Sequence, residues 1–243
     1  MEKRKDFVLL VALICALVIL NYSFLDNAVK GFLSEARTVH IERVIDGDTV
    51  VTSSGEHIRL LGINAPETSS KEPYSEEAKN YLESLIGNKN VTLEFTHEHV
   101  DKYGRTLAYL YINRSNVNVA MVENGFANYY FYSGRDIHSD ELENAWNMCL
   151  ANKVNLCEPS KEACGSCIKL GSYYYIENLC SFSCSVQNWT IKGEGRDKIV
   201  LNGTLSTNQK KEFDSSSLDL VDSGGTVFLR DEKGGFVDDK VFN

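Results

Sequence analysis

The stretches Val44 to Val50 (VIDGDTV) and Ile58 to Glu67 (IRLLGINAPE) decide the fold class of this chain. In each stretch a short run of apolar, largely β-branched residues meets a cluster of Asp, Gly, Asn or Pro. This pattern is typical of strands that end in tight turns. The two stretches therefore predict neighbouring strands whose ends carry acidic and amide side chains.

Outward from these stretches, residues 37–158 alternate short strands with amphipathic helices. We predict strands at 39–44, 49–51, 57–61, 91–95 and 107–112, and helices at 75–86, at 117–123 and from Ser139 onward. Apolar residues of the first helix recur at spacings of three and four, and Gly87 follows as a stop signal. The order predicts an α+β fold, a small β-barrel with helices packed on it.

Beyond residue 160 the sequence favours strands alone. We predict strands at 173–176, 189–191, 198–201, 217–221 and 226–229, separated by Gly, Asn, Asp and Ser. Closely spaced short strands without helices favour an all-β sandwich. The expected segments are an anchor and linker at 1–36, the barrel at 37–158, a cysteine-containing linker at 159–167 and the sandwich at 168–243.

The N-terminus has a basic start at residues 3–5, followed by apolar residues at 7–20 and 22–25. This arrangement is typical of signal peptides and signal anchors, and no good small-residue cleavage site follows it. We expect an uncleaved transmembrane helix with the remaining residues outside the cytoplasm. The alternatives are a cleaved signal on a secreted chain and a buried core helix.

Net charge excludes one class of nucleic-acid-binding protein. The chain has 25 Lys and Arg against 34 Asp and Glu, a net charge of −9. Coating of nucleic acid by bulk electrostatics needs many basic side chains that replace counterions. If this chain handles nucleic acid, it does so at a local site.

Six of the seven cysteines lie in the last hundred residues, at Cys149, Cys157, Cys164, Cys167, Cys180 and Cys184. Disulfides persist in chains that face outward, so we expect bridges, with Cys149 close enough along the chain to pair with Cys157. The spacings C-x2-C and C-x3-C leave a tetrahedral zinc site as the alternative. The sequence does not choose among the remaining pairings.

Three polar clusters lie at strand ends of the predicted barrel: 46–49, Arg59 with 64–67, and 101–105. Oxygen ligands hold hard divalent cations, guanidiniums bind phosphate bidentately, and a free carboxylate can take a proton from water. If the clusters meet on one face, the mixture suits phosphodiester hydrolysis. The predicted roles are metal ligand for Asp48 and Asn64, phosphate binding for Arg59 and Arg105, and general base for Glu67.

The segments 44–50, 58–68 and 101–109 resemble, in order, the three signature segments of the staphylococcal nuclease family, and 117–125 resembles its second helix. The resemblance covers roughly 37–158. It implies an OB-fold, a five-stranded barrel with three helices. It also implies a calcium-dependent endonuclease that cuts DNA and RNA with little sequence preference and leaves 3′-phosphate ends.

Individual roles follow from the same resemblance. It implies one calcium ion bound by Asp48 and the backbone carbonyl of Ala65 with Asp46 beside them, phosphate binding by Arg59 and Arg105, a base at Glu67, and substrate contacts from Lys102 and Tyr103. Asn64 stands where the best-studied members have an Asp ligand, so weaker calcium binding is expected. Phe131 and Ser133 stand where the family's nucleotide-packing tyrosines lie, and the available substitutes are Tyr129, Tyr130 and Tyr132.

Residues 174–178, 189–191 and 227–238 resemble the lamin-tail domain, an immunoglobulin-like sandwich, over roughly 168–243. That resemblance implies an accessory role in binding nucleic acid, an envelope component or a partner protein. A stabilising appendage is the alternative.

The sequence as a whole predicts a monomeric, membrane-anchored or secreted nuclease that acts on DNA and RNA. The alternative is a non-catalytic nucleic-acid or envelope-binding module on the same scaffold. Glu67 beside two arginines favours the enzyme, because a binding module needs no base. Asn64 favours the binding module.

Overall fold

The computed structural model describes residues 37–96, 99–132, 134–172, 174–218 and 225–242. The predicted N-terminal transmembrane helix lies outside these residues. Within them, no helix is long and apolar enough to cross a membrane.

Five strands of the described chain close into a barrel. They are β1 (Arg37–Asp46), β2 (Thr49–Thr52), β3 (His57–Leu60), β5 (Asn90–Glu94) and β6 (Thr106–Ile112). β1 pairs antiparallel with β2 and β5, β2 with β3, and β5 with β6, and the parallel pair β3–β6 closes the ring. The predicted five-stranded barrel is confirmed.

β1 can pair with two neighbours because it is long and bent. Its first residues, from Arg37 to His40, pair with β5, and the residues from Ile41 to Asp46 pair with β2. Register shifts occur in the second part, between Ile41 and Arg43 and between Val44 and Asp46. Such bulges bend a strand and raise its twist, which brings its end into the turn at Gly47.

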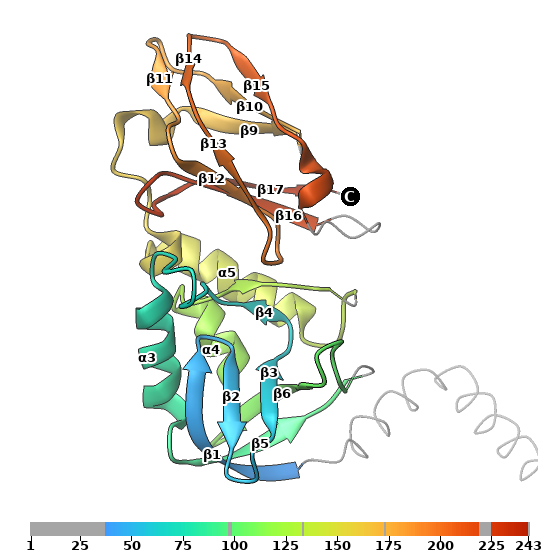
Figure 1. Cartoon of the computed structure of the whole chain (residues 1–243). Helices are drawn as coiled ribbons and strands as arrows, with labels where there is room; N and C mark the ends of the chain where they lie inside the picture. The colour runs from blue at the N-terminus through green and yellow to red at the C-terminus, as the bar shows by residue number, and fades with distance from the viewer. Residues whose placement is uncertain (1–36, 97–98, 133, 173, 219–224, 243) are drawn as a thin grey trace, which may run out of the picture. The chain divides into compact units, whose positions relative to one another are not determined.

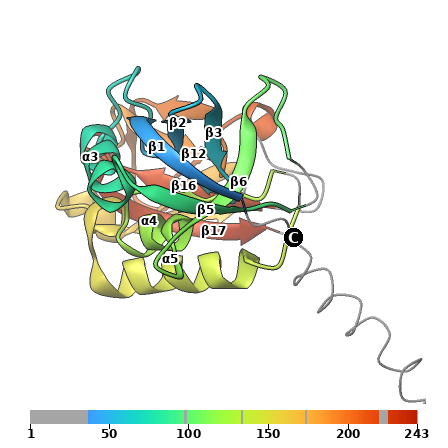
Figure 2. The same cartoon turned by 90° about the horizontal axis from the view of Figure 1, so that it is seen from below.

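Three α-helices of the described residues pack on the barrel: α3 (Ser75–Ile86), α4 (Val117–Glu123) and α5 (Ser139–Asn152). Each buries an apolar face in the barrel's core. In Figure 2, α3 lies beside the barrel strands, and α4 and α5 lie beneath them. The predicted cap at Ser139 is wrong: His138 precedes the helix, and the Ser139 hydroxyl accepts a hydrogen bond from the Asp136 backbone N–H.

Two-residue strands complete this part of the fold. β7 (Ser115–Asn116) pairs with the end of β6, and β4 (Ile63–Asn64) pairs antiparallel with β8 (Asn128–Tyr129). Segments this short have no readable periodicity, and sequence analysis did not predict them.

The C-terminal strands form three sheets, so the all-β prediction is confirmed (Figure 1). The first sheet has the strand order β13 (Lys198–Leu201), β12 (Trp189–Lys192), β16 (Gly225–Arg230), β17 (Phe236–Phe242). The second has the order β15 (Lys210–Glu212), β10 (Tyr175–Asn178), β9 (Ile168–Ser172). The third pairs β11 (Cys184–Ser185) with β14 (Thr204–Leu205). Short 3-10 helices are η1 (Asn155–Cys157), η2 (Ala163–Ser166) and η3 (Ser215–Ser217). The strand predicted at 217–221 is wrong at its start, where Ser217 ends η3, and residues 219–221 lie outside the described chain.

Strand β16 joins the barrel's core to the core of the C-terminal strands. Successive strand residues point to opposite faces, so Val227 and Leu229 pack among the C-terminal strands while Phe228 packs against the barrel's helices. The Phe228 ring lies edge-on to Trp146 at 5.2 Å and to Tyr129 at 6.1 Å, measured between ring centroids. A residue of the C-terminal sheet therefore completes the barrel's core. The division into segments at 159–167 stays a prediction.

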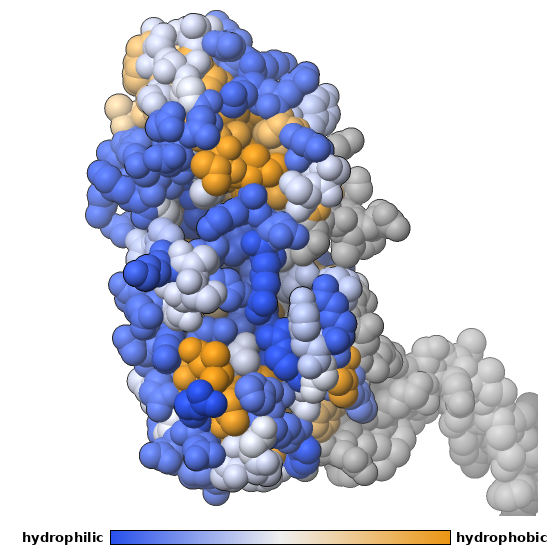
Figure 3. Space-filling view, viewed as in Figure 1, coloured by the Kyte–Doolittle hydropathy of each residue, from blue (hydrophilic) through white to orange (hydrophobic). Residues whose placement is uncertain are grey.

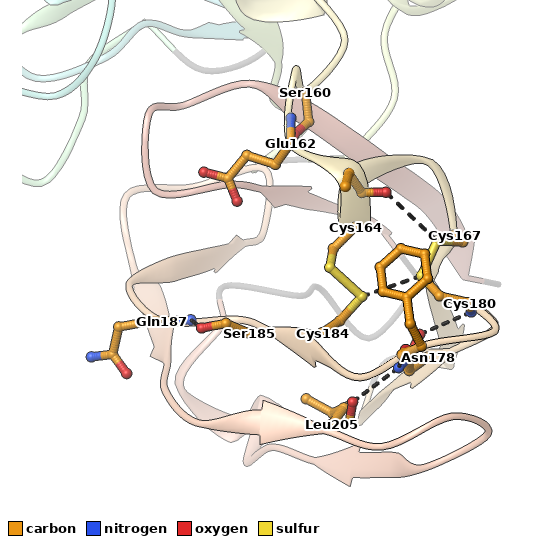
Figure 4. Close-up of a disulfide and its surroundings, with 12 residues drawn as sticks. Ser160, Glu162, Cys164, Cys167, Asn178, Cys180, Cys184, Ser185, Gln187 and Leu205 are labelled. Atoms are coloured by element: carbon orange, nitrogen blue, oxygen red, sulfur yellow. Dashed lines mark hydrogen bonds between the residues drawn. A yellow bond between two sulfur atoms is a disulfide. The ribbon is translucent and has the colours of Figure 1, made fainter.

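The six cysteines of the described chain form the bridges Cys149–Cys157, Cys164–Cys184 and Cys167–Cys180. The first joins α5 to η1, and Figure 4 shows the other two joining η2 and its end to the segment around β11. Cys164, Cys180 and Cys184 lie close enough to suggest a metal cluster. Their sulfurs are in disulfides, however, so they have no thiolate to offer zinc.

We expect thiol titration of the denatured, unreduced chain to find at most one free thiol, because six of seven cysteines are bridged. Full reduction of a small domain's bridge costs about 2–5 kcal/mol, so reductant is expected to lower the unfolding midpoint. Two or more free thiols in the unreduced chain would contradict the presence of all three bridges.

We expect Phe228→Ala to lower the free energy of unfolding by about 3–5 kcal/mol, the usual cost of a buried Phe deletion. Denaturant titration measures this cost. The matched control is Phe182→Ala, because the Phe182 side chain is 47% exposed, and it is expected to stay within about 0.5 kcal/mol of the unaltered chain. Equal effects of the two substitutions would show that Phe228 does not join the two cores.

Candidate active site

The turn between β1 and β2 packs directly against the segment that follows β4. The Asp48 backbone N–H donates to Asp46 Oδ1 at 3.0 Å. A Cβ atom on Gly47 would lie 2.6 Å from the Cβ of Ala65 and 2.8 Å from that of Ala78. Only glycine fits there, so the local sequence Asp-Gly-Asp allows the two segments to approach.

The buried Asp48 carboxylate binds three other groups. Its Oδ1 accepts from the Thr49 hydroxyl at 3.0 Å, and its Oδ2 accepts from the Ala65 backbone N–H at 2.8 Å. The same Oδ2 lies 3.0 Å from Arg59 Nη2. Asp48 therefore connects the β1–β2 turn, strand β3 and the segment after β4.

Arg59 is buried on β3, where the strand register sets it opposite Thr49. Its Nη1 donates to the Leu60 carbonyl at 3.0 Å and its Nη2 to Asn64 Oδ1 at 3.3 Å. Burial lowers the pKa of Arg59, and the neighbouring Asp48 opposes that shift. The guanidinium is held rigidly by groups on three sides.

Asn64 is fixed on β4 opposite Asn128 on β8. Its Nδ2 donates at 2.8 Å to the backbone carbonyl of Gly195, and Asn128 Nδ2 donates at 3.1 Å to that of Glu194. Both carbonyls belong to the turn between β12 and β13. The amide at position 64 thus connects the barrel to the C-terminal strands.

Arg105 projects from the start of β6 and is held by Asp101. Its Nε and Nη2 each lie 2.7 Å from Asp101 Oδ2, and its Cζ lies 5.5 Å from the centroid of the Tyr103 ring. Lys102 Nζ lies 5.3 Å from the same ring centroid. The predicted substrate residues therefore share one loop with this arginine.

Arg59 and Arg105 line one pocket of about 770 Å³. Its rim also carries Lys102, Tyr103 and Arg196, the last from the turn between β12 and β13. Figure 3 shows one face of the molecule, with a hydrophilic stretch across its middle between an upper and a lower apolar patch. The structure thus brings together the predicted arginines and the predicted substrate residues.

Glu67 is not among the residues that line this pocket, but it contacts one of them, Arg196, whose Nε is 2.8 Å from Glu67 Oε1. The backbone N–H of Glu67 donates to Glu72 Oε2 at 3.2 Å, which fixes the segment after Asn64. The predicted base and the predicted phosphate-binding residues therefore come from neighbouring segments.

The three tyrosines that could replace the family's nucleotide-packing residues differ in how exposed their side chains are. Tyr129 is buried, stacks on Phe131 at 5.1 Å and contacts the Thr226 hydroxyl at 2.6 Å, so it cannot reach a nucleotide. Tyr130 and Tyr132 line the pocket, and the Tyr132 side chain is 61% exposed. Tyr132 is the better candidate for packing on a bound base.

The carboxylates of Asp46 and Asp48 fit a hard cation. Burial, together with the neighbouring charge of Asp48, raises the pKa of Asp46 to about 7. Two crowded carboxylates are stabilised when a divalent ion neutralises them. Both oxygens of Asp48 also have partners, but Asp48 carries a negative charge. Asn64 fits less well, because its amide is neutral and both of its ends already have partners.

Arg196, Glu194 and Asn128 are site residues that sequence analysis missed. The first two lie far along the chain from the motifs, in a Gly-Glu-Gly-Arg turn that looks like any polar connection between strands. No local pattern indicates that such a turn reaches a distant pocket.

We expect Asn64→Asp to lower the free energy of unfolding by about 1–3 kcal/mol, the cost of leaving a buried polar group unpaired. A carboxylate has no N–H to offer Gly195 and would face its carbonyl oxygen. Thermal or denaturant unfolding in chelator measures the effect. The control is Asn90→Asp, because Asn90 is exposed and its Oδ1 contacts His40 Nδ1, a contact that a carboxylate keeps. An unchanged or higher stability of Asn64→Asp would contradict the role of this amide.

The chain is similar in sequence to several known nucleases. Residues 57–158 match the protein family described as staphylococcal nuclease homologue. The thermonuclease of Staphylococcus intermedius is 32% identical over 167 residues, which cover 65% of this chain and 99% of that protein. The thermonuclease of Staphylococcus hyicus is 28% identical over 159 residues, 60% of this chain and 94% of that protein. The SPbeta prophage-derived endonuclease YokF of Bacillus subtilis (strain 168) is 32% identical over 127 residues, 49% of this chain and 43% of that protein. This chain therefore belongs to the staphylococcal nuclease family.

Proposed function

We propose that this chain is a calcium-dependent endonuclease that hydrolyses phosphodiester bonds of DNA and RNA with little sequence preference and leaves 3′-phosphate ends. One observation carries the proposal: Arg59 and Arg105 line the same pocket, and each is held by a carboxylate, Asp48 or Asp101. Family membership supports a nuclease, and names of relatives such as thermonuclease and endonuclease agree.

The two guanidiniums supply preorganised donors for a phosphate group. A guanidinium held by hydrogen bonds loses little freedom when it binds phosphate, and it stabilises charge that develops during attack. Arg59 is the more rigid of the two, since it is buried and has three partners. Glu67 beside the pocket is the candidate to take a proton from the attacking water.

Calcium, when bound, supplies a positive charge that polarises a phosphate oxygen and stabilises the negative charge of the transition state. Asp48 and the backbone carbonyl of Ala65 are the residues that would hold it, with Asp46 beside them. The role of Asn64 as a calcium ligand stays a prediction that competes with its bonds to Arg59 and Gly195.

We expect the purified chain to cleave single-stranded DNA in millimolar calcium and to stop when a chelator is added. Arg105→Gln is expected to lower kcat/KM by about a hundredfold or more, the usual cost of one transition-state donor. Glu67→Gln is expected to lower kcat by about a hundredfold or more through loss of the base. Initial rates on a labelled oligonucleotide measure each effect.

The controls are Arg37→Gln and Glu42→Gln, which make the same charge changes at exposed positions of β1. Cleavage that survives both Glu67→Gln and Arg105→Gln would contradict the assigned roles. Binding of the oligonucleotide without any cleavage by the unaltered chain would favour the alternative, a non-catalytic nucleic-acid-binding module.

We also propose that the chain is exported and acts outside the cytoplasm as a monomer, held by its N-terminal apolar segment or released by cleavage there. The disulfides support export, because such bridges persist in oxidising compartments. The likeness of residues 168–243 to a lamin-tail domain, and an envelope or protein partner for them, remain predictions.

A further inference from the structure

The turn between β12 and β13, here called the 193–197 loop, is anchored in the nuclease half of the molecule. Asn64 and Asn128 form a directly paired position of the β4–β8 ladder, and their amides donate to the consecutive carbonyls of Gly195 and Glu194. In Figure 1, the β12–β13 hairpin points toward β4 and α5. The spacing of the two amides therefore matches the spacing of two successive peptide groups.

The Glu194 side chain fixes the same loop from within. This buried carboxylate accepts from the Phe131 backbone N–H at 3.0 Å through Oε2 and from the Thr226 backbone N–H at 2.9 Å through Oε1. Phe131 belongs to the segment after β8, and Thr226 belongs to β16. One side chain thus binds backbone N–H groups of the barrel segment and of the C-terminal sheet. These bonds fix the backbone that leads into Arg196.

The strand ends that flank the 193–197 loop are also tied to the site. Lys192 ends β12 and pairs with Lys198, which begins β13. Their Nζ atoms lie 3.1 Å and 3.0 Å from the two carboxylate oxygens of Glu72. Burial by itself would raise the pKa of Glu72, but the two lysines hold it below its usual value. Glu72 also accepts from the Glu67 backbone N–H, so the hairpin and the segment of the predicted base share one anchor.

Arg196 leaves this fixed loop toward the pocket. Its side chain is 44% exposed, lies against Glu67 through Nε, and lines the pocket with Arg59 and Arg105. Its positive charge is one of the causes, after burial, of the lowered pKa of Arg59. Each of the three arginines forms an ion pair with a carboxylate: Arg196 with Glu67, Arg59 with Asp48, and Arg105 with Asp101.

We infer that Arg196 is a third phosphate-binding residue of the nuclease site, supplied by the C-terminal strands, and that it contacts the nucleic-acid backbone while holding Glu67 beside it. This inference rests on the proposed function. A guanidinium has five N–H donors in a planar fork, so a contact through Nε leaves the Nη groups to bind phosphate oxygens.

The geometry favours substrate binding over blockage of the site. The buried part of the 193–197 loop, Gly193 to Gly195, sits against Asn64 and Asn128 and not inside the pocket. The pocket keeps about 770 Å³ with Arg196 on its wall. A blocking segment would fill this space.

The test compares the unaltered full-length chain with Arg196→Gln, Arg196→Lys and Arg37→Gln. Arg37 is a matched control, because it is 46% exposed, pairs with one carboxylate, Glu56, and is not among the residues that line the pocket. Binding of a fluorescent single-stranded oligonucleotide is followed by anisotropy in chelator across a range of salt concentrations. Cleavage in calcium is followed separately.

Arg196→Gln is expected to lower the slope of log affinity against log salt by about 0.7, the contribution of one single-strand phosphate contact. Arg196→Lys is expected to restore the slope, and Arg37→Gln to leave it unchanged. In the cleavage assay, Arg196→Gln is expected to lower kcat/KM by about tenfold or more, the range for one charge-assisted hydrogen bond.

Two results overturn the inference: a salt slope for Arg196→Gln equal to that of Arg37→Gln, or a higher kcat/KM for Arg196→Gln than for the unaltered chain. The second result would mean that Arg196 masks Glu67 instead of serving the substrate. Failure of the proposed function is distinguishable. In that case the unaltered chain does not cleave in calcium, while the binding slopes still decide the role of Arg196.

Discussion

The buried ion pair between Asp48 and Arg59 is the interaction on which the site depends. Removing one partner of a buried pair costs about 3–5 kcal/mol, because the other charge is left in the interior. Asp48 also accepts from Ala65, so the pair joins the β1–β2 turn, strand β3 and the segment after β4. The contact that connects these three segments therefore also holds a guanidinium at the pocket wall.

The second constraint is the contact between the barrel and the C-terminal sheet. Because β4 and β8 set Asn64 opposite Asn128, their amides bind two successive carbonyls of the 193–197 loop. This contact gives a physical reason for an amide where an acidic ligand is expected in the family, because an amide donates to the Gly195 carbonyl and an ionised carboxylate cannot. The C-terminal part of the chain thus supplies Arg196 and Asp197 to the wall of the pocket.

Much of the barrel was predictable because its signals are local. The strands end in Asp-Gly-Asp and Asn-Ala-Pro-Glu turns, and the helices bury residues at spacings of three and four. The predictions failed where the signal was weak. Strands of two or three residues, such as β11, β14 and β15, have no period to read, and the cap of α5 moved by one residue because Asp136 and Ser139 form their own turn.

The sequence by itself determined the barrel, its three helices and two of the arginines that line the pocket, Arg59 and Arg105, because each lies in a motif of residues adjacent along the chain. Only the tertiary structure decided which cysteines pair, that Phe228 completes the barrel's core, and that Arg196 meets Glu67. These contacts join residues far apart in sequence. Which residues meet in such contacts depends on how whole sheets pack, and a local pattern of residue types does not predict that packing.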